Sequence, residues 1–272
     1  MKKLNGKTAI VTGASRGIGV HIVDSLTKNG VSVIGIARSK NGLENTGTIV
    51  ANNSGNYEYL EFDLAKANSL PKLYSKFENR NIDFLINNAG IEIYRNFDKY
   101  KFEEINKIII VNLLVPMEFT RLLLPKIKAN KGHVINIASL AGKKGVIYNG
   151  VYSATKSGLI LWSDALDQEL KEFGVGVTAV CPGYIAETGM FNDGGYPPPA
   201  LLGESDPRKV GKAVINAITK GKKEIIVNSV PIRPLLAISQ IFPHFSDTII
   251  KWLGVPDLCR KRAFESKGGN RT

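Results

Sequence analysis

A tyrosine and a lysine lie four residues apart in the segment Y-S-A-T-K, which spans residues 152–156. On a helix, Tyr152 and Lys156 would share one face, one turn apart. A phenol with an ordinary pKa of about 10 is a weak acid-base group at neutral pH unless a nearby cation favours its anion. The pair could therefore exchange a proton with a carbonyl or alcohol oxygen. The alternative is a packed tyrosine beside a solvated lysine, and the surroundings must decide between the two.

A serine could complete such a site. Ser139 follows the apolar run H-V-I-N-I-A (133–138), thirteen residues before Tyr152, and its hydroxyl could donate to the same oxygen. A serine nucleophile would need an activating base, and none of the three histidines is placed to supply one: His21, His133 and His244. The sequence therefore disfavours a serine hydrolase.

An asparagine interrupts a long apolar helical run. Asn112 lies within I-I-I-V-N-L-L-V-P, four residues before Pro116. Because proline has no N–H, the Asn112 carbonyl loses its usual helical partner and is left free to hold a water or a ligand. A buried amide satisfied by helix packing is the alternative.

The elements that must position these residues alternate along the chain. Continuous apolar runs of strand length, rich in β-branched residues, lie at 8–12, 31–37, 83–87, 133–138, 176–181 and 224–228. Helical patterns lie at 17–29, 69–80, 101–129, 151–173 and 206–220. Such strands are typical of a sheet covered on both faces, so the pattern predicts a Rossmann-like, doubly wound parallel sheet in a three-layer αβα arrangement. Ligands bind such sheets at the carboxyl ends of the strands.

Composition is ordinary for a soluble globular protein. The chain has 272 residues, of which 43% are hydrophobic and 22% charged, and we assign 1–230 to a single α/β domain and 231–272 to a C-terminal extension. The two cysteines show neither metal nor disulfide spacing, and no signal-like stretch opens the chain, so we expect a cytoplasmic protein without a bound metal. The net charge of +12 is scattered, without interleaved aromatic residues, which disfavours a nucleic-acid partner.

A glycine-rich segment, T-G-A-S-R-G-I-G, follows the first predicted strand and opens the first predicted helix. Gly13, Gly17 and Gly19 would let the backbone approach a pyrophosphate, and the helix N-terminus would offer it free N–H groups. A tight turn without a ligand is the alternative. The position between strand and helix favours a dinucleotide site.

The end of the second predicted strand indicates which dinucleotide. An NAD site would place an acidic residue there, but the chain has Ala37, Arg38 and Ser39, with no acid before Glu44. Arg38, together with Arg16, could hold a 2′-phosphate through charge-assisted hydrogen bonds. The sequence therefore favours NADP(H) over NAD, with a solvated surface arginine as the alternative.

Several motifs occur together in one order: T-G-A-S-R-G-I-G, F-D-L (62–64), N-N-A-G (87–90), Asn112, Ser139, Y-S-A-T-K and P-G (182–183). In this order and spacing the chain resembles the classical short-chain dehydrogenase/reductase family over residues 4–228. The resemblance implies a set of cofactor-binding residues: Gly13, Ser15, Arg16, Gly17, Ile18, Gly19, Arg38, Ser39, Asp63, Leu64, Asn88, Ala89, Gly90, Tyr152, Lys156, Pro182, Gly183 and Ile185.

The resemblance also implies individual roles. Asp63 would lie by the adenine, and the backbone of Ile185 would approach the nicotinamide carboxamide. One departure is visible, because Glu187 stands where the family often has threonine, and Thr188 follows it. Asn112 would bind a water that relays protons through Lys156. The family also forms dimers and tetramers through its helices, so we expect a homodimer or homotetramer.

Together these features predict an NADPH-dependent oxidoreductase that transfers a hydride between nicotinamide and a carbonyl or secondary alcohol. Tyr152 would be the acid or base, Lys156 its electrostatic partner, Ser139 the donor to the carbonyl and Asn112 the relay. Epimerisation on the same fold is one alternative. Enoyl reduction is another, disfavoured by the short spacing between tyrosine and lysine. A non-enzymatic NADP-binding regulator or scaffold is the third, and such a protein would be expected to have lost part of this residue set.

Two segments beyond the motifs remain. The Gly/Pro-rich stretch 187–205 is expected to form a lid over the substrate. In the extension, apolar residues recur at helical spacing (Leu235, Ile238, Phe242, Phe245, Ile249 and Leu253), which predicts two short amphipathic helices broken at Pro243 and followed by a basic tail. Polar residues and prolines divide the extension, so it is not expected to span a bilayer. We expect it to form a wall of the pocket, suited to an apolar substrate, or an intersubunit contact; docking on an anionic membrane is the alternative.

Overall fold

The structure is a computed structural model that describes residues 4–186, 188–193, 195–199 and 201–265. Seven parallel strands form one sheet in the order β3-β2-β1-β4-β5-β6-β7. They are β1 Thr8–Thr12, β2 Ser32–Ala37, β3 Tyr57–Glu61, β4 Phe84–Asn87, β5 His133–Ile137, β6 Gly176–Pro182 and β7 Glu224–Val227. The strand order reverses between β1 and β4, which is where such a sheet binds ligands. The predicted Rossmann-like parallel sheet is confirmed.

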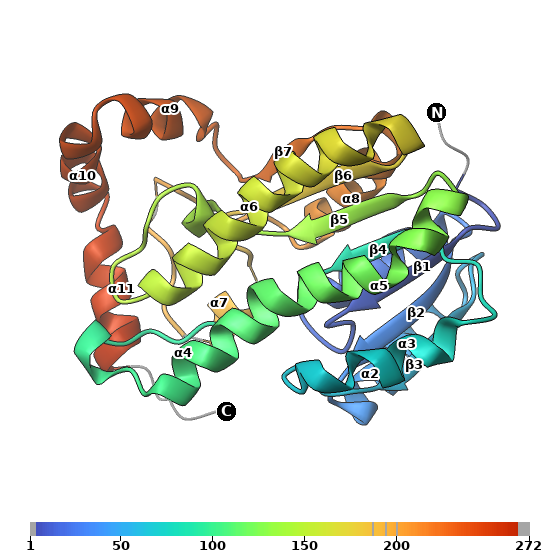
Figure 1. The fold of residues 1–272 in the computed structure, drawn as a ribbon. Helices are drawn as coiled ribbons and strands as arrows, with labels where there is room; N and C mark the ends of the chain where they lie inside the picture. Colours follow the sequence, from blue (N-terminus) through green and yellow to red (C-terminus); the bar gives the residue numbers. More distant parts are fainter. Residues whose placement is uncertain (1–3, 187, 194, 200, 266–272) are drawn as a thin grey trace.

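Helices cover both faces of the sheet (Figure 1). On one face lie α1 (Ile18–Lys28), α2 (Lys40–Val50) and α8 (Arg208–Lys220). The other face is covered by α3 (Leu70–Tyr74), α5 (Val115–Ala129) and α6 (Gly150–Leu170). Each set buries its apolar side chains against the strands in a separate core cluster, so the three-layer arrangement is also confirmed.

The predicted strands are all present, but within the sheet and the helices that cover it two elements escaped prediction. The first is β3, an edge strand with the sequence Y-E-Y-L-E, whose side chains are at most half-buried. It lacks the continuous apolar run that marks a strand covered on both faces. The second is α2, a polar helix whose N-cap Ser39 accepts a hydrogen bond from the Gly42 N–H at 3.1 Å.

The predicted helix 101–129 is continuous but not uniform. It consists of α4 (Phe102–Ile109), one π-helical turn (Ile110–Leu114) and α5. Pro116 lies just after this turn, where it cannot donate to the helix. By length and composition alone, Phe102–Ala129 could cross a bilayer. Its buried residues, however, pack against the sheet in the core, as those of a core helix do: Val115, Phe119, Leu123 and Ile127.

Beyond the carboxyl ends of the strands stands the C-terminal extension (Figure 1). The pattern predicted two helices, and the structure has both: α9 (Arg233–Ile241) and α10 (Pro243–Trp252). A third helix that the sequence did not indicate, α11 (Val255–Phe264), follows them within the basic tail. Its sequence carries no apolar stripe, and what it buries includes the charged Arg262. Residues 266–272 lie outside the described part of the chain.

Candidate active site

A single cavity of about 650 Å³ opens at the carboxyl ends of the strands and reaches from the glycine loop to the C-terminal extension. Of the residues predicted to bind cofactor or substrate, all but Asn112 line it. The short helix α7 (Gly189–Asp193) and Leu202 of the predicted lid also contribute. Glu187, whose place in the family motif is unusual, lies outside the described residues.

Tyr152 and Lys156 lie in the first two turns of α6 and are almost fully buried. The Lys156 Nζ donates a hydrogen bond to the Ile137 carbonyl at 2.8 Å and lies 5.6 Å from the centre of the Tyr152 ring. Ser139 follows β5, and its Oγ accepts a hydrogen bond from the Ala141 N–H at 3.1 Å. The Ser139 hydroxyl proton is therefore not used in that bond and can be donated elsewhere.

The surroundings of Tyr152 keep it protonated. Burial raises the pKa of its phenol above the ordinary value, and the Glu92 carboxylate raises it further. A hydrogen bond with Ser139 and the charge of Arg262 oppose this rise but do not outweigh it. The role of Lys156 as the electrostatic partner of Tyr152 stays a prediction. A protonated phenol is the form that can donate a proton.

Lys156 has the opposite shift. Burial lowers the pKa of its ammonium to about 8, although the charge of Glu92 favours the protonated form. The ammonium points to the end of β5 through its bond with Ile137, so its contact with Tyr152 is with the ring face. Lys156 is therefore a cation that neutral pH retains and moderately alkaline pH removes.

Asn112 lies in the π-helical turn and is fully buried. Its side-chain amide both accepts from the Ile91 N–H and donates to the Ile91 carbonyl, each at 2.8 Å, and it also donates to Thr155 Oγ1 at 3.2 Å. These bonds hold the loop after β4 against α6. The packed, satisfied amide that the sequence left as an alternative describes this side chain, and the relay function of Asn112 stays a prediction.

The glycine loop is fixed by Thr12, which was not among the predicted site residues. Thr12 Oγ1 accepts hydrogen bonds from the Asn88 and Ala89 N–H groups, each at 3.0 Å, and so ties the end of β1 to the end of β4. The Asn88 amide in turn donates to the Thr12 carbonyl at 2.9 Å. A side chain at Gly13 would collide with Ala89, and Gly13 has φ 69°, so only glycine suits this close approach.

This half of the cavity fits a dinucleotide phosphate. In the described structure no side chain caps α1, and no acidic residue lies in its first turn, so its N–H groups are available to an anion. Arg38 lines the rim, and no ion pair holds it within the described residues. Arg16, its predicted partner, instead contacts Asp193 of α7 at 2.5 Å. Both groups are exposed, so this contact is weak enough to be exchanged for a phosphate.

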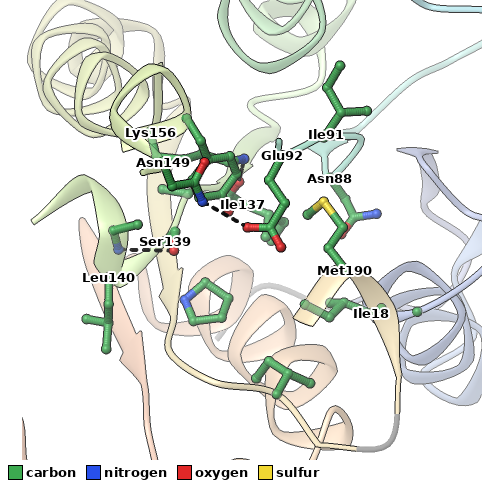
Figure 2. A pocket seen from close by; sticks show the side chains of 18 of the residues that line it. Ile18, Asn88, Ile91, Glu92, Ile137, Ser139, Leu140, Asn149, Lys156 and Met190 are labelled. Atoms are coloured by element: carbon green, nitrogen blue, oxygen red, sulfur yellow. Dashed lines mark hydrogen bonds between the residues drawn. The ribbon is translucent and has the colours of Figure 1, made fainter. Parts of the chain in front are cut away.

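Some cavity residues were missed by sequence reasoning. Glu92 and Asn149 point toward each other beside Lys156 in Figure 2, and the Asn149 Nδ2 donates to Glu92 Oε2 at 3.2 Å. The Met190 side chain lies beside Asn88 in the same view. Nothing in the local sequence marked these residues, since an isolated acid after N-N-A-G or an asparagine before a helix is common in proteins.

The half of the cavity beyond the predicted catalytic residues has an aliphatic wall, although Glu92, Lys144 and Arg262 also line the cavity. Its lining includes Leu140, Val146, Tyr184, Met190 and Leu202, together with Ile232, Leu235, Leu236, Ile250, Leu253 and Val255 of the C-terminal segment. The predicted apolar stripe is divided, because Leu235 and Leu253 line the cavity whereas Phe242 and Phe245 are exposed. The chain turns between α9 and α10 at Phe242, which directs that corner outward.

Comparison with known proteins identifies the family. A model described as short chain dehydrogenase matches residues 7–195. The chain is 45% identical to the ketoacyl reductase HetN of Nostoc sp. over 271 residues, which are 97% of this chain and 94% of the relative. It is 30% identical over 240 residues to an uncharacterized oxidoreductase of Staphylococcus aureus, covering 86% of this chain and 100% of the relative.

Solved structures agree with the sequence matches. A metagenomic short-chain oxidoreductase in complex with NADP is similar with a TM-score of 0.71 and 29% identity, covering 83% of this chain and 98% of that chain. A short-chain dehydrogenase from Streptomyces avermitilis is similar with a TM-score of 0.74 and 25% identity, covering 91% and 97%. The motifs, the fold and these relatives lead to one conclusion: the chain belongs to the short-chain dehydrogenase family and is an oxidoreductase.

Proposed function

We propose that the protein is an NADPH-dependent ketone reductase that acts on an apolar, acyl-type substrate. The observation that carries this proposal is the position of Ser139, Tyr152 and Lys156 at the meeting point of two unlike half-cavities. One half is lined by the glycine loop, Arg38 and the free end of α1. The other is lined by aliphatic side chains of the lid and the extension.

The preference for NADP(H) is part of this proposal. Bound NADPH would supply the hydride that reduces the carbonyl carbon. The α1 N-terminus and the glycine loop would hold the pyrophosphate, Arg38 and Ser39 the 2′-phosphate, and Asp63 and Leu64 the adenine side. The metagenomic relative in complex with NADP supports the same cofactor class.

The catalytic residues have distinct tasks. Ser139 donates a hydrogen bond to the carbonyl oxygen and orients it. Tyr152 gives that oxygen its proton, since its raised pKa keeps the phenol protonated at neutral pH. Lys156 stabilises the phenolate that remains, and Asn112 fixes the loop beside it and is the proposed relay to solvent. A protonated donor favours reduction over oxidation as the working direction.

The substrate class follows from the lining of the second half-cavity. An aliphatic wall contributes binding energy of about 0.8 kcal/mol for each methylene group removed from water. HetN, the relative that is 45% identical, is named a ketoacyl reductase, which fits a ketone attached to such a chain. A 3-oxoacyl thioester is therefore the substrate that we propose first.

The proposal includes a cytoplasmic homo-oligomer, as is common for the family. Epimerisation and a non-enzymatic NADP-binding role are the alternatives. The epimerisation alternative predicts exchange of a substrate proton without net oxidation of NADPH. The non-enzymatic alternative predicts cofactor binding with no turnover.

A panel of carbonyl compounds tests the proposal. Purified protein is mixed with NADPH and with short, long-chain and cyclic ketones, including 3-oxoacyl thioesters, while absorbance of the reduced nicotinamide is followed. We expect NADPH oxidation with the long-chain 3-oxoacyl thioesters and formation of the 3-hydroxy product. Tight NADPH binding without turnover of any ketone would contradict the proposed function.

A further inference from the structure

A buried arginine of the C-terminal extension reaches the catalytic region. Arg262, on α11, has a side chain that is only 6% exposed. Its Nη2 donates to Glu92 Oε1 and to the Met190 carbonyl, each at 2.9 Å, and its Nη1 lies 3.4 Å from the Tyr94 hydroxyl. The guanidinium also stacks over the Tyr94 ring, 4.4 Å from its centre. Arg262 is thus fully engaged by protein groups.

The partners of Arg262 belong to three separate parts of the fold. Glu92 and Tyr94 lie in the loop after β4, and Met190 lies in α7, within the predicted lid. The second oxygen of Glu92 accepts a hydrogen bond from Asn149, the N-cap residue of α6 and three positions before Tyr152. Arg262 therefore joins the extension and the lid to the loop that contacts the catalytic helix.

Arg262 and Glu92 bind each other and neighbouring protein groups, so they are suited to holding segments in place and not to recognising a substrate. Both carboxylate oxygens of Glu92 already have protein donors, so the pair offers a ligand no unsatisfied carboxylate. A buried ion pair adds little net stability compared with apolar packing, but it fixes one arrangement of the groups that it joins. On α11 only Leu258, Cys259 and Arg262 are buried, so this helix has few other anchors.

We propose that Arg262 is a positioning residue that latches the C-terminal extension and the lid over the substrate half of the cavity. The inference rests on the proposed function. With the latch formed, the aliphatic part of a long-chain ketone lies against Leu235, Leu236, Ile250 and Leu253. A short ketone occupies only the space beside Ser139 and Tyr152 and does not depend on that wall.

The variant Arg262→Met tests the latch. Its control is Arg260→Met, which removes an exposed arginine from the same helix. With a long-chain 3-oxoacyl thioester, Arg262→Met should raise KM about tenfold or more while kcat changes less than about twofold, because uniform binding is lost and the transition state is untouched. With acetoacetyl thioester, both constants should stay near those of the unmodified protein. Arg260→Met should match the unmodified protein on both substrates.

A charge-neutral variant separates the latch from its electrostatic effect. Arg262→Met also leaves the Glu92 carboxylate without its cation, so the raised KM must be shown to come from the open latch and not from this charge. The double variant Glu92→Gln with Arg262→Met removes both charges but keeps the latch open. The double variant should keep the raised KM for the long-chain thioester. Arg262→Lys, which keeps a cation at this position, should bring KM for that substrate part of the way back to the value of the unmodified protein.

Hydrogen exchange gives a readout that does not depend on turnover. In the NADP⁺-bound protein, amides of Val255–Phe264 should exchange at least about tenfold faster in Arg262→Met than in Arg260→Met, since local opening is then easier. Unchanged exchange, or an equal loss of kcat with short and long ketones, would overturn the latch. If the unmodified protein turns over no ketone, the proposed function fails, and the exchange result still decides the latch.

Discussion

The two halves of the cavity are built in different ways. The cofactor half is lined by short segments that directly follow strands β1 to β4, and hydrogen bonds between neighbouring strand ends hold it, such as those of Thr12 with Asn88 and Ala89. The substrate half is assembled from the loop after β4, the start of α6, the lid and α9 to α11. A site built at strand ends has a fixed geometry, whereas one assembled from distant helices varies with their packing.

The halves also differ in polarity. Backbone N–H groups and arginines surround the predicted phosphate positions, and aliphatic side chains surround the far end. Between them lie the predicted catalytic residues. Burial is the chief cause that raises the pKa of Tyr152 and lowers the pKa of Lys156. Changes in each part should therefore alter different constants: the chemical step, the cofactor preference or the substrate KM.

The largest effect is expected at the junction of the halves. Lys156→Met removes the cation that would stabilise the Tyr152 phenolate formed by proton donation. We expect kcat for ketone reduction to fall by about 10²- to 10⁴-fold, the range of general acid–base contributions. Steady-state kinetics with NADPH in excess provide the measurement. Activity within a fewfold of the unmodified protein would show that Lys156 is not needed electrostatically.

The next largest effect is expected in the cofactor half. Arg38→Glu places a carboxylate where the 2′-phosphate of NADPH is expected. NAD sites carry an acidic residue at the same place. The ratio of kcat/KM for NADPH to that for NADH should fall by about 100-fold or more, as one strong charge-assisted contact is lost and a repulsion is added. Arg208→Glu, at an exposed arginine of α8 that does not line the cavity, serves as the control. An unchanged ratio would mean that another group selects the cofactor.

A smaller effect is expected from pH. The pKa of Lys156 is lowered to about 8, so the ammonium is present below that pH and is lost above it. Since the phenolate left by proton donation needs this cation, kcat/KM for reduction should be flat near neutrality and decline on the alkaline side of about pH 8. The profile should lose this limb in Lys156→Met. A rate that stays constant to pH 10 would contradict the assignment.

The smallest kinetic effect is expected on the outer surface. Leu161 of α6 and Leu114 before α5 are 69% and 46% exposed, on helices that should form the subunit contact. Light scattering at micromolar concentration should give the mass of a dimer or tetramer, and Leu161→Glu should lower it while kcat changes little. A monomeric mass for the unmodified protein would refute the predicted homo-oligomer.

The cofactor half could be predicted from the sequence because its constraints are local. Glycines in G-A-S-R-G-I-G and an arginine in place of an acid act through the backbone or through one charge, within a few residues of a strand end. The continuous apolar strands were equally recognisable, whereas the half-exposed edge strand β3 was not.

The substrate half could be predicted only in outline. The sequence predicted that the extension forms a wall of the pocket, but not that Arg262 contacts Glu92, which lies 170 positions earlier in the chain. Such a contact depends on how α11 packs, and neither residue has a local pattern that marks it. The effect of burial on Tyr152 was missed for the same reason, since desolvation is a property of the assembled cavity.

The most direct test of the account is Tyr152→Phe, which removes one hydroxyl from the junction of the two halves. We expect NADPH to bind with a Kd within about threefold of the unmodified protein, while single-turnover reduction of a 3-oxoacyl thioester falls by at least about 100-fold, because the proton donor is lost and the dinucleotide contacts are kept. Single-turnover reduction at near the unmodified rate, with NADPH bound, would contradict Tyr152 as the proton donor.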